Sequence, residues 1–243
     1  MKIFIANWKL HSDLSMARNF LQKLKGLKEL EKNKIVICPP LLYLHSLQDI
    51  LKFKNFELGA QDVFITPDEK ETGSISAENL KEANVSWVIL GHSEQIKRHN
   101  MNLNDINKKL MYTLEKNLNA VLCVGEGLME RRQNMQFDVV KDQLHKILDK
   151  VPSFFSKNIV IAYEPVWSIG SSKAASVSDI MSMTTFLKKE LSKLGFKDSR
   201  VIYGGSVHSG NAAEILSVPE IEGLLIGRSG VEVNELYNIA NAE

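Results

Sequence analysis

Three side chains capable of acid–base or electrostatic chemistry each follow an apolar run of the sequence. Lys9 closes the run that begins at Lys2, His92 follows WVILG, and Glu164 follows NIVIAY. A carboxylate can remove a proton from carbon, a neutral imidazole can polarise a carbonyl oxygen, and an ammonium can stabilise a phosphate or a developing enolate. The three residue types together predict proton transfer at carbon through an anionic intermediate.

The neighbours of two of these side chains suit that chemistry. Pro165 restricts the backbone of Glu164 to an extended conformation, which fixes the direction of the carboxylate. Val166 and Trp167 can shield it from water, which makes it a stronger base. His92 precedes a predicted helix start, and a helix N-terminus disfavours the imidazolium. Taken singly, the three residues have plainer interpretations: a solvated lysine, a structural histidine and a carboxylate with a basic partner.

Glycine-rich segments follow the last two apolar runs. They are Gly204-Gly205-Ser206 and Gly227-Arg228-Ser229-Gly230, and their backbone N–H groups can approach a ligand closely. Each segment could equally be a tight turn, but barrels often bind phosphate with the loops after strands 7 and 8. We therefore expect a phosphorylated ligand. The other polar residues at the ends of apolar runs are Asn7, Gln61 and Gly125-Glu126.

Eight β-branched, apolar runs must position these residues. Continuous apolar runs are typical of parallel strands that are buried on both faces. Doubly wound open sheets show the same alternation of strand and helix, but eight strands favour a closed (β/α)8 TIM barrel, with outer helices and residues 1–243 in a single domain. The runs are KIFIANW from Lys2, KIVICP from Lys34, FELGAQ from Phe56, SWVILG from Ser86, AVLCVG from Ala120, NIVIAYE from Asn158, RVIYGG from Arg200 and GLLIG from Gly223.

Apolar stripes at helical spacing lie between several of these runs. They cover residues 17–27, 103–114, 137–151 and 180–194. Ser12 or Asp13, and the Ser176-x-x-Asp179 pattern, are predicted helix N-caps. The sequence therefore predicts a helix after each strand, packed on the outside of the sheet.

The composition excludes several classes of protein. Thirty basic and twenty-nine acidic residues give a net charge of +1, which argues against a nucleic-acid partner or a polybasic membrane surface. The N-terminus becomes polar at Asn7, before a signal-like apolar region forms, and no run approaches the roughly 18 apolar residues of a membrane span. Cys38 and Cys123 lack the spacing of a metal or redox motif. We expect a soluble, cytoplasmic protein.

With these residues assembled, the chain resembles the triosephosphate isomerase family over its whole length. Five segments carry the resemblance, in the order and at the spacing that the family shows. They are Asn7-Trp8-Lys9, Gly91-His92-Ser93-Glu94, Cys123-Val124-Gly125-Glu126, Ala162-Tyr163-Glu164-Pro165-Val166-Trp167 and Tyr203-Gly204-Gly205-Ser206.

The resemblance implies interconversion of dihydroxyacetone phosphate and glyceraldehyde 3-phosphate, in glycolysis and gluconeogenesis, without a cofactor or metal. Glu164 would move a proton between two carbons, and His92 would polarise the carbonyl and shuttle protons between the two oxygens. Lys9, helped by Asn7, would stabilise the enediolate. The substrate-binding residues that the resemblance implies are Asn7, Trp8, Lys9, Gly170, Ser206, Gly227 and Arg228.

The resemblance also implies a moving lid and a partner subunit. Residues 165–175 would close over the substrate, with Trp167 and Glu126 holding the lid open and Tyr203 latching it shut. The chain would form a homodimer in which the loop of residues 62–76, with Thr72 and Gly73 at its tip, inserts into the partner.

Three positions depart from the family pattern. Arg228 stands where glycine is usual, and any requirement for positive φ there would strain the backbone. We expect its side chain to point to the rim, near the phosphate. Gln95 and Ile96 replace two arginines, and Ser171-Ser172 replaces a Thr-Gly hinge in the lid.

The alternatives to this function are another phosphate-binding barrel isomerase or aldolase, and a barrel without catalytic activity. A Schiff-base aldolase needs a lysine inside the barrel on a later strand, and the later runs contain none. A non-catalytic barrel that binds sugar phosphates would leave the joint presence of Lys9, His92 and Glu164 unexplained.

Overall fold

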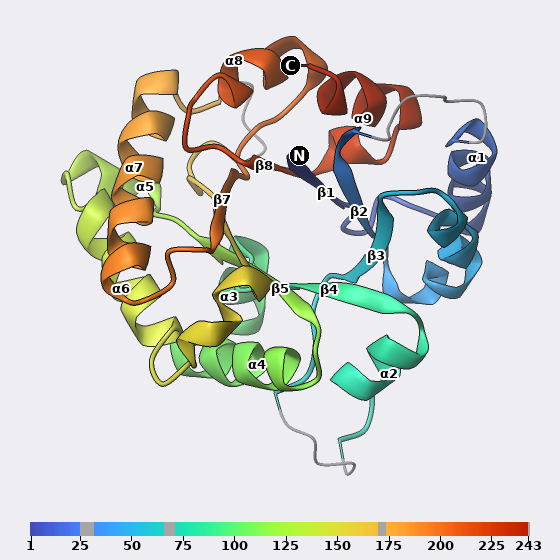
Figure 1. Cartoon of the computed structure of the whole chain (residues 1–243), viewed down its shortest axis with the longest axis horizontal. Coiled ribbons are helices and arrows are strands. Elements are labelled where there is room, and N and C mark those ends of the chain that lie inside the picture. The colour runs from blue at the N-terminus through green and yellow to red at the C-terminus, as the bar shows by residue number, and fades with distance from the viewer. Residues whose placement is uncertain (25–31, 66–70, 170–173, 243) are drawn as a thin grey trace.

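The computed structural model describes residues 1–24, 32–65, 71–169 and 174–242. Eight parallel strands, each hydrogen-bonded to the next, form a closed barrel in which β8 pairs with β1 (Figure 1). This confirms the predicted (β/α)8 barrel. The strands are β1 (Ile3–Asn7), β2 (Lys34–Cys38), β3 (Phe56–Ala60), β4 (Val85–Leu90), β5 (Asn119–Val124), β6 (Ile159–Tyr163), β7 (Arg200–Tyr203) and β8 (Gly223–Ile226).

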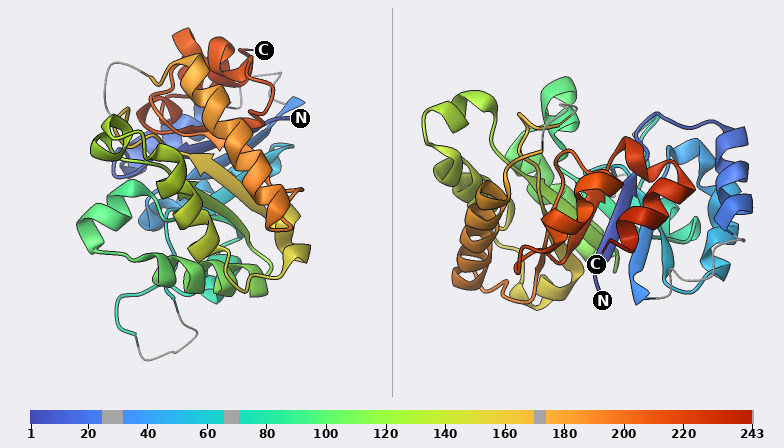
Figure 2. Two further views of the ribbon diagram at one scale, coloured as in Figure 1. Left: turned by 90° about the vertical axis from the view of Figure 1, so that its left-hand side faces the viewer. Right: turned by 90° about the horizontal axis from the view of Figure 1, so that it is seen from above.

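Helices stand around the outside of the barrel wall, as the views from two further directions also show (Figure 2). The four predicted stripes correspond to α1, α4, α6 and α7, although residues 25–27 of the first stripe lie outside the described residues. The α-helices are α1 (Leu14–Leu24), α2 (Ala77–Glu82), α3 (Ser93–His99), α4 (Leu103–Glu115), α5 (Leu128–Arg132), α6 (Gln136–Ile147), α7 (Val177–Lys193), α8 (Ser209–Leu216) and α9 (Val233–Ala240).

Both predicted N-caps are made. The Oδ1 atom of Asp13 accepts the N–H of Met16 at 2.8 Å, at the start of α1. At the start of α7, Ser176 Oγ accepts the N–H of Asp179 at 3.1 Å. Each cap satisfies one backbone donor that the first turn of a helix leaves without a partner.

The connection from β2 to β3 differs from the predicted helix. It is formed by two 3₁₀ segments, η2 (Leu41–Tyr43) and η3 (His45–Lys52). Its buried residues are Leu44, Leu47 and Ile50, at intervals of three. A 3₁₀-helix has three residues per turn, so this spacing places all three side chains on one face, against the barrel.

Side chains alternate between the inside of the barrel and the layer under the helices, as the pleat of a strand requires. The inner cluster contains Ile3, Ile5, Val36, Cys38, Trp87, Ile89, Val121, Cys123, Val160, Ala162, Ile202 and Leu225. Two residues beyond the last inward-facing residue of a strand, the next residue also faces inward. At the C-terminal ends of four strands these residues are Asn7, Glu164, Gly204 and Gly227. The alternation that fills the barrel therefore also directs these four residues toward its interior.

Among the described residues, no helix is both long enough and apolar enough to cross a membrane.

Candidate active site

A cavity of about 420 Å³ opens at the C-terminal ends of the strands. It brings together residues that follow five different strands, as the sequence predicted for a closed barrel. Its lining consists of Asn7, Lys9, His11, His92, Glu94, Glu164, Ile169, Gly204, Gly205, Ser206, Val207, Leu225, Gly227, Arg228 and Ser229.

Glu164 and His92 contact each other inside this cavity. The Nε2 atom of His92 lies 3.1 Å from Oε1 of Glu164, and both residues are buried. The Nδ1 atom of His92 accepts the backbone N–H of Glu94 at 3.2 Å, so it cannot also carry a hydrogen. The ring hydrogen therefore belongs on Nε2, where a neutral imidazole donates to Glu164. A neutral donor is the form that the sequence predicted for His92.

The position of Glu164 depends on a glycine in the neighbouring strand connection. A Cβ atom at Gly125 would lie 1.8 Å from the carbonyl oxygen of Glu164, so no larger residue fits there. The Glu164 N–H donates to the Val124 carbonyl at 2.8 Å and continues the β5–β6 pairing by one residue. The Glu164 carboxylate therefore extends from a hydrogen-bonded strand end and not from a loose loop.

Lys9 forms an ion pair in the same cavity. Its Nζ atom lies 3.2 Å from Oε1 of Glu94. Burial raises the pKa of Glu94, but nearby positive charges, chiefly the Lys9 ammonium with a smaller contribution from Arg98, outweigh it and hold the pKa below its usual range. Asn7 supports the lysine from the backbone side, because its Oδ1 atom accepts the Lys9 N–H at 3.1 Å.

The expected phosphate-binding residues Ser206, Gly227 and Arg228 line the cavity together. Arg228 is not among the described residues with positive φ, so the backbone strain considered for this position is absent. The Arg228 side chain has no carboxylate partner in the described part of the chain. Gly170, which was also expected at the phosphate, lies outside the described residues.

Trp8 does not line the cavity, which corrects its expected substrate contact. Its side chain is fully buried on the outer side of the barrel, with its ring centre 5.0 Å from that of Phe20 in α1. Its Nε1 atom donates to the Gly230 carbonyl at 3.0 Å. The reason is the period of two: Asn7 points inward, so Trp8 must point outward.

The two ends of the predicted lid are tied down at both sides of residues 170–173, which lie outside the described range. At the first end, Trp167 Nε1 donates to Oε1 of Glu126 at 2.8 Å. At the second end, the Ala175 N–H donates to the Tyr203 hydroxyl at 3.1 Å. The first contact joins the pair that the family resemblance implied, whereas the resemblance named Tyr203 without a partner.

Glu126 is fully buried and has several partners. The Tyr163 hydroxyl lies 3.3 Å from both carboxylate oxygens, and Arg131 lies 3.7 Å from Oε1 with its guanidinium over the ring of Trp167. Burial raises the pKa of Glu126, and the hydrogen bond from Trp167 opposes that effect only in part.

Several residues that line the cavity were not among the predicted site residues, among them His11, Glu94 and Ile169. The pairing of Glu94 with Lys9 joins residues 85 positions apart, so local spacing carries no signal for it. Among the described residues, no three His, Cys, Asp or Glu side chains are grouped so that they could hold a metal ion.

Comparison with known proteins gives one consistent family. The sequence model of triosephosphate isomerase matches residues 2–243. A triosephosphate isomerase from Alkaliphilus oremlandii is 35% identical, over 98% of this chain and 98% of its own length. One from Lawsonia intracellularis is 36% identical, over 100% and 98%. A chloroplastic triosephosphate isomerase from Fragaria ananassa is 37% identical, over 99% of this chain and 77% of its own.

Proposed function

The chain belongs to the triosephosphate isomerase family and interconverts dihydroxyacetone phosphate and D-glyceraldehyde 3-phosphate, and we propose that Glu164, His92, Lys9 and Asn7 carry out this reaction. The observation that carries the assignment of roles is the direct contact between a buried carboxylate and a neutral imidazole donor. A base and an acid at this separation can act on adjacent atoms of one small substrate.

The proton transfers follow from this geometry. Glu164 removes a proton from the carbon next to the carbonyl, and the electron pair of the broken C–H bond forms the C=C bond of the enediolate. His92 donates its Nε2 hydrogen bond to the carbonyl oxygen as negative charge develops there, and protons move between the two oxygens at this ring. Glu164, now protonated, returns the proton to the neighbouring carbon, so that acid and base end in their starting states.

Lys9 supplies the positive charge for the anionic intermediate. Its ammonium is held within the cavity by Glu94, and attraction to an enediolate is stronger in a cavity that excludes water. Asn7 lies beside it and fixes its backbone. The substrate phosphate binds at the far side, to backbone N–H groups of Ser206, Gly227 and Arg228, which line the cavity together.

Closure of residues 165–175 keeps water from the enediolate, which would otherwise lose its phosphate by elimination. Trp167 with Glu126 holds the first end of the lid in one position, and Tyr203 with Ala175 holds the second. This role for the segment rests on the family resemblance together with these two contacts.

We further propose that residues 1–243 form a single domain, that two chains associate and that the protein is cytoplasmic, without a nucleic-acid or membrane partner.

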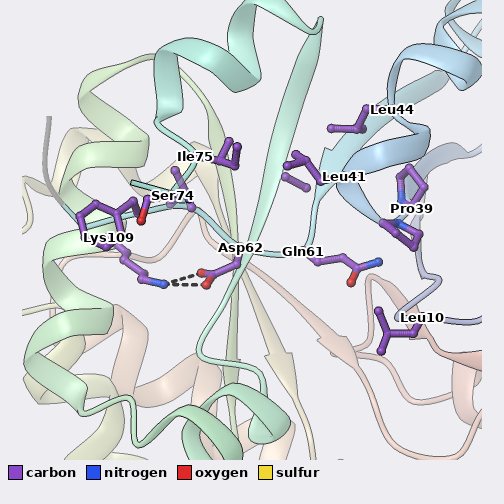
Figure 3. Close-up of a pocket in the computed structure, with 14 residues that line it drawn as sticks. Leu10, Pro39, Leu41, Leu44, Gln61, Asp62, Ser74, Ile75 and Lys109 are labelled. Atoms are coloured by element: carbon purple, nitrogen blue, oxygen red, sulfur yellow. Dashed lines mark hydrogen bonds and ion pairs between the residues drawn. The ribbon is translucent and has the colours of Figure 1, made fainter. Parts of the chain in front are cut away.

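The described ends of the loop of residues 62–76 project beyond the barrel (Figure 1). A second cavity of about 380 Å³ lies beside this loop, lined by Leu10, Leu41, Phe64 and Ile75 among others, and could receive the partner's loop around Thr72 (Figure 3). A parent protein that sediments at the mass of one chain would contradict the dimer, and a Leu41→Asp variant that remains a dimer would show that this cavity is not part of its interface.

The catalytic roles are tested with Glu164→Gln, which removes the base but keeps the size of the side chain. In a coupled assay with glyceraldehyde 3-phosphate, kcat should fall by at least about 100-fold, within the range attributed to a positioned acid or base. Glu214→Gln, at an exposed carboxylate of α8, is the matched control and should retain the parent rate. An equally active Glu164→Gln enzyme would disprove the assignment of the base.

A further inference from the structure

Gln61 joins three strand ends at the edge of the proposed active site. It follows β3 directly, and its Nε2 atom donates to the carbonyl of Lys9 at 2.9 Å and to the carbonyl of Cys38 at 3.0 Å. Cys38 is the last residue of β2, and Lys9 lies two residues beyond the end of β1. Both hydrogens of the Gln61 amide are therefore used by backbone acceptors of other strands.

The Lys9 backbone needs such support because its conformation is unfavourable. Its φ is 49°, in the left-handed region that a residue with a Cβ atom and no short polar side chain rarely adopts. The Asn7 side chain holds the Lys9 N–H, and the Gln61 side chain holds its carbonyl. The peptide groups on both sides of Lys9 are thus fixed, which sets the direction of its side chain.

Gln61 is itself anchored by the next residue. The Asp62 carboxylate binds Lys109 Nζ through both oxygens, at 2.6 and 2.7 Å, and Lys109 is buried. In Figure 3, Asp62 points toward Lys109 on one side of the strand end, and Gln61 extends the other way, toward Leu10 and Pro39. The ion pair fixes the backbone from which the Gln61 amide reaches Lys9.

We propose that Gln61 is a positioning residue for Lys9: by holding the Lys9 carbonyl, it keeps the left-handed turn that aims the ammonium into the active site. This inference rests on the proposed role of Lys9. It assigns to Gln61 an effect on the stabilisation of the enediolate, although the two hydrogen bonds of its amide go to backbone carbonyls.

The test is a double-mutant cycle. Gln61→Met keeps the length of the side chain and removes both donors, and Lys9→Met removes the ammonium. In the parent background, Gln61→Met should lower kcat/KM by about 10-fold or more, because the released carbonyl lets the Lys9 backbone relax. In the Lys9→Met background it should change kcat/KM by less than about 2-fold, since no ammonium remains to be positioned. Gln22→Met, an exposed glutamine of α1, is the control and should behave as the parent.

Other outcomes overturn the proposal separately from the proposed function. Parent activity in Gln61→Met, or an equal loss in both backgrounds, would show that Gln61 does not act through Lys9. Parent activity in Lys9→Met alone would instead refute the role of Lys9. Thermal unfolding and sedimentation of each variant separate these effects from loss of fold or of assembly. If Gln61→Met does not fold, Gln61→Glu takes its place in the test. Near neutral pH the new carboxylate has no hydrogen to donate to the two backbone carbonyls. At lower pH the carboxyl group is protonated and can donate one hydrogen bond, so the activity of the variant relative to the parent should rise.

Discussion

A single methyl group at Gly205 should destabilise the protein because the space beside it is already filled. A Cβ atom there would lie 2.1 Å from the Tyr203 hydroxyl oxygen and 2.6 Å from Ser168 Oγ, whereas ordinary contact begins at 3.4 Å. The Tyr203 ring is fully buried and packs edge-on against Tyr163, with ring centres 6.2 Å apart. It cannot turn away, so the tyrosine or the strand end must move by roughly 1 Å.

The expected cost follows from two effects. Overpacking of a filled core costs about 1–3 kcal/mol. Moving the hydroxyl also breaks its hydrogen bond from the Ala175 N–H, which contributes about 1 kcal/mol. The lower flexibility of alanine in the unfolded chain offsets about 0.5 kcal/mol of this loss. Gly205→Ala should therefore lower the free energy of unfolding by about 1.5–3.5 kcal/mol, or roughly 3–14 °C in Tm for a chain of this length.

Denaturant unfolding at a fixed protein concentration measures this difference. Gly127→Ala is the matched control: its Cβ atom would also lie close to an oxygen, at 2.6 Å, but this is Oε2 of Glu130, the movable end of a flexible side chain. Its cost should stay near 0.5 kcal/mol, since alanine is only a poorer N-cap than glycine. If the two variants lose the same stability, the fixed position of Tyr203 is not what makes Gly205 necessary.

Three further predictions concern charge and capping. Arg228→Gln should raise KM about fivefold at low salt and by little at about 1 M salt, where charges are screened within about 3 Å. If KM of Arg228→Gln depends on salt as KM of the parent and of the exposed control Arg18→Gln does, the Arg228 charge does not contribute to phosphate binding. Glu126→Gln keeps an acceptor for Trp167 and removes a carboxylate whose pKa burial raises. The stability linked to that raised pKa is present below the ordinary value of about 4.3 and is lost as pH rises through the folded value. In denaturant unfolding, the stability of the variant relative to the parent should therefore increase as pH rises above about 4, and a difference that does not change with pH would contradict this. Ser176→Ala should cost about 1 kcal/mol of unfolding free energy, because one donor of the α7 N-terminus loses its acceptor.

Much of the fold was predictable because parallel strands and amphipathic helices leave local signals. All eight strands occur where the apolar runs predicted them, and Ser176 caps its helix as its spacing indicated. The β2–β3 connection was missed, although the three-residue spacing of Leu44, Leu47 and Ile50 is a readable 3₁₀ signal.

The candidate site was predictable only in part, for two physical reasons. Which face of β1 points inward cannot be read from IFIAN, because both faces of a barrel strand are apolar. The substrate contact of Trp8, which was taken from the family resemblance, could therefore not be checked against the sequence. The partners of Lys9 come from elsewhere in the chain: Glu94 and Gln61 meet it only when the barrel closes. The side chains that could do chemistry were visible locally, whereas those that hold them in place were not.

The alternation at the end of β1 makes the length of this segment more critical than its composition. Successive side chains of a strand point to opposite faces, so the number of residues from Ile3 determines which face each side chain is on. Asn7 is four residues from Ile3 and faces the cavity, whereas Trp8 is five residues from Ile3 and faces α1. Deleting one residue between Ile3 and Asn7 would exchange their faces, burying an amide among apolar side chains and pushing an indole into the substrate's space. A substitution within the strand changes the packing at one position, whereas a one-residue deletion would remove function and core packing together.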